Sequence, residues 1–379
     1  MTAPTGWRDP DRMATTPSRT AALSPAGLAA ALLAAACAHA PPANAGRPPP
    51  ALPGPWESPR YRDHPLAGRI LDVRSGRFLD PTALESAAAA APFLLLGETH
   101  DNADHHRLQA WLLRAAAAGR RPALAFEMLD ASQQPAVDAV RAEGGDADAI
   151  ARAVAWERSG WPPFAMYRPL FAEGLERGLA IVAANLPRTL VRAVVKEGRA
   201  ALPEPLLRSL ARDEPLAPAV EEGLRQEMAE VHCGRLPPEL LDPLVLAQRA
   251  RDAEMARRLL AADRGSGAVL IAGAGHVRRD RGVPALLGRD APGRASLAVA
   301  FVEVSPSRRA PGDYAGDYSA PSLPFDVVVF TPAAERADPC AGIPPGTTTR
   351  GAGTPGVRLG PRGGKLEEEL ARPSPPPNQ

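Results

Sequence analysis

One stretch of the chain concentrates side chains that can do acid–base or metal chemistry. An apolar run, residues 93–96, is followed by the carboxylate of Glu98 and by three of the seven histidines, His100, His105 and His106. Such a short apolar run predicts a strand buried on both faces. The helical spacing of the apolar residues after it predicts a helix. Glu98 and His100 are therefore expected at the carboxyl end of a strand, where open α/β sheets bind ligands.

Three further predicted strands also end on polar side chains. They are residues 122–126, ending on Glu127; residues 179–184, ending on Asn185; and residues 268–272, followed by a Gly-Ala-Gly-His sequence that ends on His276. Strands that alternate with helices form a parallel sheet, so these ends should open on one edge of it.

The side chains at this edge allow two kinds of chemistry. His100, Glu127 and His276 could hold a divalent metal ion, because imidazole and carboxylate groups are common ligands of such ions. They could also position water for hydrolysis while Glu98 acts as the general base. A single histidine after a strand is usually structural, but several polar strand ends together favour a genuine site.

Further residues are expected to line the same pocket. His106 and Gln109 share a face of the helix that follows the first strand. Helix N-termini at this edge favour an anionic ligand, and arginines add positive charge. Beyond the catalytic candidates, the predicted pocket residues are His105, His106, Gln109, Asn185, Arg188 and Arg278.

The overall pattern predicts an α/β fold: a parallel-sheet core with helices on both faces. The helical pattern at about 188–262 is too long for an ordinary crossover and predicts an inserted helical cap subdomain. We expect the folded domain at 61–335 and a disordered tail at 336–379, which is rich in Pro, Gly and charge. The net charge of +1 gives no indication of nucleic-acid binding.

The first residues of the chain predict export. A small and apolar run at 21–36 follows Arg19; it is too short and Ala-rich for a membrane span but suits a signal peptide at 1–36. The run ends at Cys37 in a sequence that resembles a bacterial lipobox, so we expect lipidation of Cys37. Ordinary secretion and an Ala-rich leader without function are the alternatives.

Residues 37–60 are rich in Pro and Ala and predict a stiff tether between membrane and domain. An aspartate directly after the lipidated cysteine would signal retention at the inner membrane, but residue 38 is Ala. We therefore expect a lipid-anchored protein of the bacterial cell envelope, in the outer membrane and facing the periplasm. The true start is either Met1 or Met13.

The cysteines and an aromatic segment complete the candidates. Three cysteines predict no disulfide framework. Cys233 could be a nucleophile paired with His232, but neighbours on a helix point apart, so a structural role is favoured. Two Trp, one Tyr and three Pro crowd into residues 156–169 and predict packing in a lid. The alternative is a surface for a flat apolar cofactor such as haem, with Tyr167 and Met166 as ligands.

Several motifs resemble those of ChaN-like haem-binding lipoproteins. Leu96 to Gln109 reads Leu-Gly-Glu-Thr-His-Asp-Asn-x-x-His-His-x-x-Gln, like the opening motif of that family. Residues 232–234 (His-Cys-Gly), 248–256 and 275–284 are similar to its later motifs. They occur in the same order, and the resemblance covers about residues 65 to 305.

The resemblance implies an EreA/ChaN-like α/β domain in an envelope lipoprotein for haem or iron uptake. Relatives can pair around haem with a tyrosine on the iron, which implies a homodimer. The uptake role implies an outer-membrane haem receptor as a further partner. The wider superfamily, with the Tiki, TraB and erythromycin-esterase-like proteins, carries two Gly-x-x-His motifs and a strand-end Glu. Residues 97–100, residues 273–276 and Glu127 match that pattern. No motif identifies the haem tyrosine: we expect Tyr167, and leave Tyr61, Tyr314 and Tyr318 open.

Two functional hypotheses follow. The first is a lipoprotein that binds haem or iron without turnover. The second is a metal-dependent hydrolase of the Tiki or erythromycin-esterase-like type. The lipid anchor and the resemblance favour the carrier, whereas the set of histidines and carboxylates favours the enzyme.

Overall fold

The computed structural model describes residues 49–52, 54–212, 215–338 and 340–341 of the chain. The predicted signal peptide, Cys37, and most of the predicted tether and tail lie outside the described residues. In the part of the chain that is described, no helix is long and apolar enough to cross a membrane.

The described residues form an eight-stranded sheet in the order β2-β1-β8-β7-β3-β6-β4-β5. All neighbours from β8 to β5 run parallel, and only β1 and β2 at the edge pair antiparallel. The strands are β1 (Ile70–Asp72), β2 (Arg77–Leu79), β3 (Phe93–Glu98), β4 (Ala123–Asp130), β5 (Ile181–Asn185), β6 (Ala268–Gly273), β7 (Ser296–Glu303) and β8 (Val327–Thr331). The α/β prediction and the predicted parallel sheet are confirmed.

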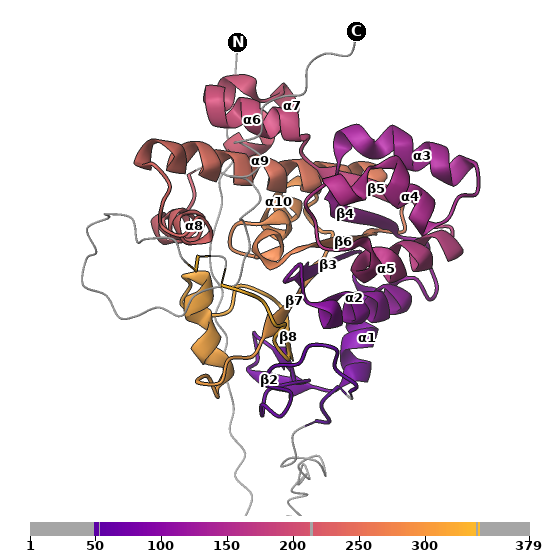
Figure 1. The fold of residues 1–379 in the computed structure, drawn as a ribbon, viewed down its shortest axis with the longest axis vertical. Helices are drawn as coiled ribbons and strands as arrows, with labels where there is room; N and C mark the ends of the chain where they lie inside the picture. Colours follow the sequence, from indigo (N-terminus) through magenta and orange to yellow (C-terminus); the bar gives the residue numbers. More distant parts are fainter. Residues whose placement is uncertain (1–48, 53, 213–214, 339, 342–379) are drawn as a thin grey trace, which may run out of the picture. The chain divides into compact units, whose positions relative to one another are not determined.

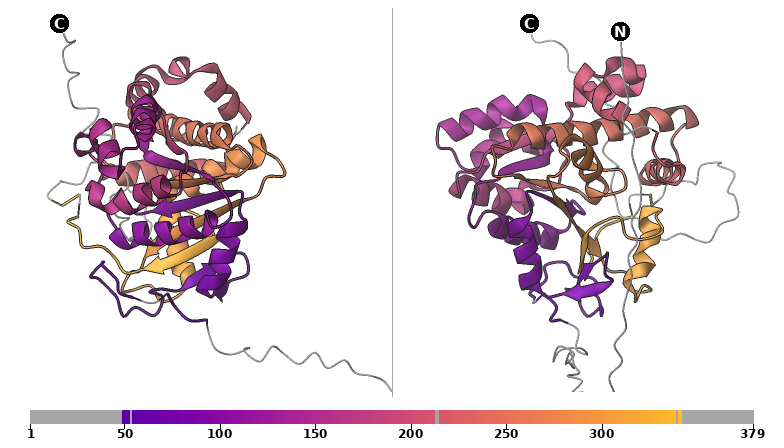
Figure 2. Two further views of the ribbon diagram at one scale, coloured as in Figure 1. Left: turned by 90° about the vertical axis from the view of Figure 1, so that its right-hand side faces the viewer. Right: turned by 180° about the vertical axis from the view of Figure 1, so that it is seen from behind.

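The apolar run in β3 is continuous because helices cover both faces of the sheet. Side chains alternate between the faces of a strand. Leu94 and Leu96 accordingly join one hydrophobic cluster, and Phe93 and Leu95 join another on the opposite face. Figures 1 and 2 show the two helical layers with the sheet between them.

Each hydrophobic cluster is completed by its own set of helices. The first layer contains α1 (Pro81–Ala90), α2 (Ala103–Ala116), α3 (Gln134–Ala142), α4 (Ala147–Ala153) and α5 (Phe164–Glu176). The second contains α6 (Arg188–Glu197), α7 (Glu204–Arg212), α9 (Pro238–Ala262) and α10 (Val283–Asp290).

The segment predicted as an inserted cap contributes to the second of these layers. Its longest helix, α9, packs directly on the sheet, whereas α6 and α7 pack on α9 (Figure 1). Only α8 (Pro218–Val231) has a separate small cluster, in which Leu224 and Met228 contact Val245 at the start of α9. Figure 1 shows α8 set apart from the sheet, beneath one end of α9.

Two details shape the carboxyl edge of the sheet. β4 does not end at Glu127, as predicted, but continues to Asp130 with an irregular register against β5. A short 3-10 helix, η4 (Ala274–Val277), follows β6 and crosses close to β3. A Cβ atom on Gly97 would lie 2.9 Å from the Cα of Ala274, so only glycine permits this approach.

Both ends of the folded domain extend further than the sequence indicated. Ser58, in the predicted tether, is buried and hydrogen-bonded to Asn102 and Asp104 (2.9 and 2.8 Å). Arg336, in the predicted tail, donates to Asp101 from Nε and Nη2, at 2.8 and 2.7 Å. These residues of the predicted tether and tail are therefore part of the fold.

A disulfide joins Cys233 to Cys340, with the Cα atoms 5.7 Å apart. It links the turn after α8 to the segment after β8. The expectation that the three cysteines provide no disulfide framework must be corrected for this pair. The two residues lie 107 positions apart, and neither has a local motif that indicates its partner.

Candidate functional site

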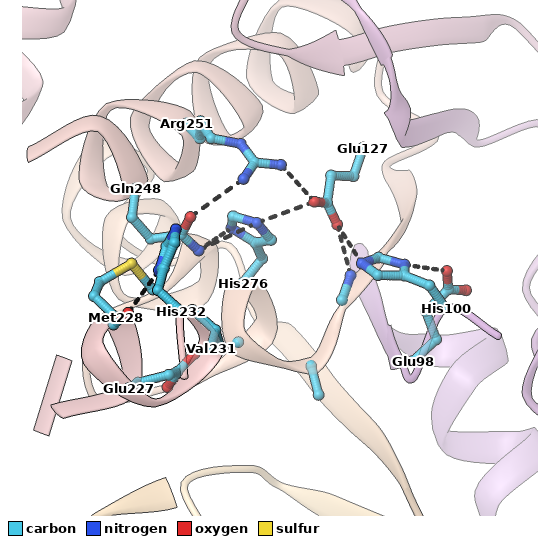
Figure 3. Close-up of a pocket in the computed structure, with 13 residues that line it drawn as sticks. Glu98, His100, Glu127, Glu227, Met228, Val231, His232, Gln248, Arg251 and His276 are labelled. Atoms are coloured by element: carbon cyan, nitrogen blue, oxygen red, sulfur yellow. Dashed lines mark hydrogen bonds and ion pairs between the residues drawn. The ribbon is translucent and has the colours of Figure 1, made fainter. Parts of the chain in front are cut away.

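A polar pocket opens at the carboxyl edge of the sheet, with a volume of about 60 Å³. The strand ends and η4 contribute Glu98, His100, Glu127, His276 and the backbone of residues 273–275. The helices contribute Glu227, Met228, Val231 and His232 from α8 and its end, and Gln248 and Arg251 from α9. Figure 3 shows His100 on one side, His232 on the opposite side, and His276 between them. The structure thus brings together the four catalytic candidates Glu98, His100, Glu127 and His276, but Asn185, the remaining strand-end candidate, does not line the pocket.

Glu98 is the centre of a fully buried network on the β3 side. One carboxylate oxygen accepts hydrogen bonds from Tyr167 (2.6 Å) and from His100 Nδ1 (2.8 Å), and the other lies 3.1 Å from His106 Nδ1. Burial opposes ionisation, but His106 and His100 outweigh it and lower the pKa of Glu98 to about 2. The carboxylate therefore stays ionised, and a carboxylate with so low a pKa is a weak base, which argues against its predicted role as the general base.

His100 is the imidazole that this network presents to the pocket. Since its Nδ1 donates to Glu98, the neutral ring carries its lone pair on Nε2. That Nε2 atom lies 3.9 Å from Glu127, and the side chain is 17% exposed. Trp161 packs edge-on against the ring, with the ring centroids 4.9 Å apart. His100 is thus an oriented base with one nitrogen facing the pocket.

Glu127 is the centre of a second buried network, on the β4 and β6 side. Its oxygens lie 2.6 Å from Arg251, 3.2 Å from His276 Nε2 and 2.7 Å from the donating backbone N–H of Gly273. Burial again opposes ionisation, but His276, His100 and Arg251 outweigh it and hold the pKa of Glu127 well below its usual range. The carboxylate is therefore fully charged and fully compensated.

His276 is held between two carboxylates. Its Nδ1 lies 2.6 Å from Asp252 of α9, and its Nε2 faces Glu127. Burial disfavours the charged ring, but Glu127 and Asp252 outweigh this and raise the pKa of His276 to about 9. At neutral pH both ring nitrogens therefore donate, one to each carboxylate.

The predicted metal set does not form a metal centre. In the described residue ranges, no three His, Cys, Asp or Glu side chains are arranged to hold a metal ion. The physical reason is local: Arg251, His276 and Gly273 already occupy the oxygens of Glu127.

Tyr167 does not fit the predicted role of haem ligand. It has no exposed surface, and its hydroxyl group donates to Glu98. Burial and the charge of Glu98 raise the pKa of Tyr167 well above 10, which opposes the tyrosinate form that binds iron. Met166, its half-buried neighbour, packs against the hydrophobic cluster on this face of the sheet.

Six residues predicted to line the pocket do not line it. His105 accepts from the N–H of Thr99 and bonds Thr331, and burial lowers its pKa to about 4. Three of the others contact residues of the two networks or their strands: His106 contacts Glu98, Gln109 donates to the carbonyl of Leu96 in β3, and Asn185 accepts from Arg251. Arg278 donates to Glu227 and Asp280, and Arg188 donates to the carbonyl of Ser159.

The sequence analysis missed the polar residues contributed by the helices. Gln248, Arg251 and Asp252 lie on α9, and Glu227 and His232 lie on α8 and at its end. The signal for α9 was present, since Arg251 and Asp252 interrupt an otherwise apolar buried helix face. The way in which α9 crosses the sheet decides which of its charged residues reach the strand ends. The hydrophobic periodicity of the helix does not reveal this crossing.

Comparison with known proteins places this geometry in a family. Residues 84–287 match the family described as "Haem-binding uptake, Tiki superfamily, ChaN". The chain belongs to this family. The resemblance inferred from the Gly-Glu-Thr-His and Gly-Ala-Gly-His motifs is thereby confirmed. No curated protein matches the chain.

The ChaN-type fold is supported by one solved structure, and a second structure is a weaker match. The structure "Cofacial heme binding to ChaN of Campylobacter jejuni" matches 69% of this chain and 95% of that chain, with 19% identity and a TM-score of 0.53. A mutant of the erythromycin esterase EreC in its open conformation matches 67% of this chain and 94% of that chain, with 15% identity and a TM-score of 0.38. At these identities the likeness concerns the fold alone.

Proposed function

We propose that this ChaN-family protein binds haem at its surface, with Tyr61 as the iron ligand, and serves haem or iron uptake in the cell envelope. Family membership supports haem as the ligand. The assignment of Tyr61 as the iron ligand rests on the solvent exposure of the tyrosine side chains. Of the four tyrosines, Tyr167, Tyr314 and Tyr318 are at most 1% exposed, and Tyr61 alone reaches the surface.

An arginine side chain lies beside Tyr61 at the surface. The guanidinium group of Arg60 lies 5.5 Å from the centre of the Tyr61 ring, and its Nη2 is 3.5 Å from the hydroxyl oxygen. The polar pocket is small, about 60 Å³, and is lined mainly by charged and polar side chains, which suits haem less well than the exposed surface at Tyr61.

The cellular setting is part of the same proposal. Lipidation at Cys37 would hold the protein in the outer membrane facing the periplasm, where an outer-membrane haem receptor would supply haem and a second copy of the chain would cover it. The Cys233–Cys340 disulfide supports a compartment outside the cytosol, because structural disulfides persist in oxidising compartments.

Haem titration tests the proposal. Adding haemin to the full chain should give a Soret band that is lost in Tyr61→Phe and kept in Tyr167→Phe, the matched control on a buried tyrosine. A Soret band that survives Tyr61→Phe and disappears in Tyr167→Phe would contradict the assignment.

A second function, hydrolysis of a small ester or amide, is favoured by the state of His100. Its Nδ1 is held by ionised Glu98 and its Nε2 faces the pocket, as expected of a general base that activates water. Turnover of nitrophenyl esters that is lost in His100→Gln and unaffected by a metal chelator would support this function. Turnover abolished by the chelator would instead favour the metal-dependent alternative.

A further inference from the structure

His232 is a buried histidine with one nitrogen left unused. The side chain is 4% exposed and lines the pocket at the end of α8. Its Nδ1 lies 2.7 Å from the carbonyl oxygen of Met228, which can only accept a hydrogen bond, so Nδ1 carries the proton. In the neutral ring Nε2 is then an acceptor. Among the described residues, Nε2 is buried and has no hydrogen-bond partner.

The chain fixes this ring in place. Cys233 and Gly234 adopt left-handed backbone conformations (φ of 57° and 65°) that end α8 directly after His232. The disulfide to Cys340 then ties the same turn to the segment after β8. A buried acceptor without a partner costs stability, so a ring held in this way is better explained by a ligand than by packing.

Gln248 lines the same pocket and shows which chemical group would suit His232. Its Nε2 lies 3.3 and 3.4 Å from the two ring nitrogens of His276. Because protonated His276 already donates from both nitrogens to Asp252 and Glu127, it cannot accept from Gln248. The amide hydrogens of Gln248 are therefore available to a ligand oxygen.

The pocket thus offers an acceptor at His232 and a donor at Gln248. A hydroxyl group both donates and accepts, and matches this pair. The volume of the pocket limits the bound part to a few heavy atoms.

We propose that His232 is a ligand-binding residue that accepts a hydrogen bond from a hydroxyl group of a small polar molecule, or of the hydroxylated end of a larger one. This subsite is independent of haem binding at Tyr61. It lies across the pocket from His100, where Figure 3 shows the two imidazoles on opposite sides.

The test observes the ring itself in the full chain labelled with ¹⁵N-histidine, with the His232 signals assigned by His232→Phe. The probe is glycerol, and the matched control is 1,2-dimethoxyethane, which accepts but cannot donate hydrogen bonds. We expect a proton on Nδ1, held by the carbonyl oxygen of Met228, and a saturable shift of the Nε2 resonance with glycerol only. His64, a half-buried histidine outside the pocket whose Nε2 also has no partner, should not respond.

Glycerol affinity should fall about tenfold in His232→Phe, the effect of losing one hydrogen bond to the ligand. The proposal is overturned if His232 is protonated on Nε2 instead, or if glycerol and the ether shift His232 and His64 alike, which would indicate solvent only. If His232→Phe does not fold, the remaining six histidines can be assigned by substitution, and the titration of the unsubstituted chain decides alone.

Discussion

The pocket at the sheet edge and the turn at Tyr61 differ in almost every property relevant to binding. The pocket is small and enclosed, and its charges are compensated: Glu98 by histidines, Glu127 by Arg251 and His276. Tyr61 lies at the surface beside an arginine, in a turn with a φ of 64°. Under the two proposals, acid–base chemistry would belong to the pocket and haem binding to the surface at Tyr61.

The largest effect that separates the two regions is expected from the disulfide. Cys233→Ser should lower the free energy of unfolding by about 4 kcal/mol, because the bond closes a long loop and holds the α8 side of the pocket. Urea unfolding measures the change. A reducing agent should destabilise the unsubstituted chain equally and leave Cys233→Ser unchanged. Soret absorbance with haemin should survive the substitution, since Tyr61 does not depend on α8.

The next effect is expected in the pocket network. Arg251→Met should cost about 3 kcal/mol of stability, because it leaves the buried charge of Glu127 with one partner fewer. The matched control is Arg114→Met, which breaks a partly exposed pair with Glu173 and should cost less than about 1 kcal/mol. Equal losses of unfolding free energy in the two variants would mean that the Arg251–Glu127 pair contributes no more to stability than a partly exposed ion pair.

The pH dependence of stability should reveal His276. Its pKa rises from 6.5 to about 9 on folding, so its contribution is complete below pH 6.5 and is lost as the pH rises through 9. Stability should fall by about 3 kcal/mol between those values. In His276→Asn the decline should be much smaller, and an unchanged decline would show that another group causes it.

Much of the fold was predictable because local patterns determine it. The buried strands follow from short apolar runs such as Leu94–Leu96, and Asp80 caps α1 as Asp-Pro sequences do. The meeting of Glu98, His100, Glu127 and His276 follows from parallel strands, since β3, β6 and β4 are neighbours. Contacts set by long-range packing could not be predicted: Arg251 and Asp252 of α9 reaching the strand ends, and Cys340 reaching Cys233.

The misassigned tyrosine has a similar cause. Tyr167 lies in an aromatic-rich segment, which suggested a haem surface, but α5 turns it inward to stack near His106 and bond Glu98. The sequence shows which residues a helix contains. It shows less clearly which face of that helix packs against the rest of the protein. Tyr61 had no such neighbourhood and became the candidate only through its exposure.

The smallest expected effect on stability accompanies the largest on haem. Tyr61→Phe should change the free energy of unfolding by less than about 0.5 kcal/mol, because it removes one hydroxyl group at the surface.

The measurement that tests the two-region account most directly is haemin titration of Tyr61→Phe beside Arg251→Met. The account predicts no Soret band in the first and a normal one in the second. A normal band in Tyr61→Phe and none in folded Arg251→Met would contradict it.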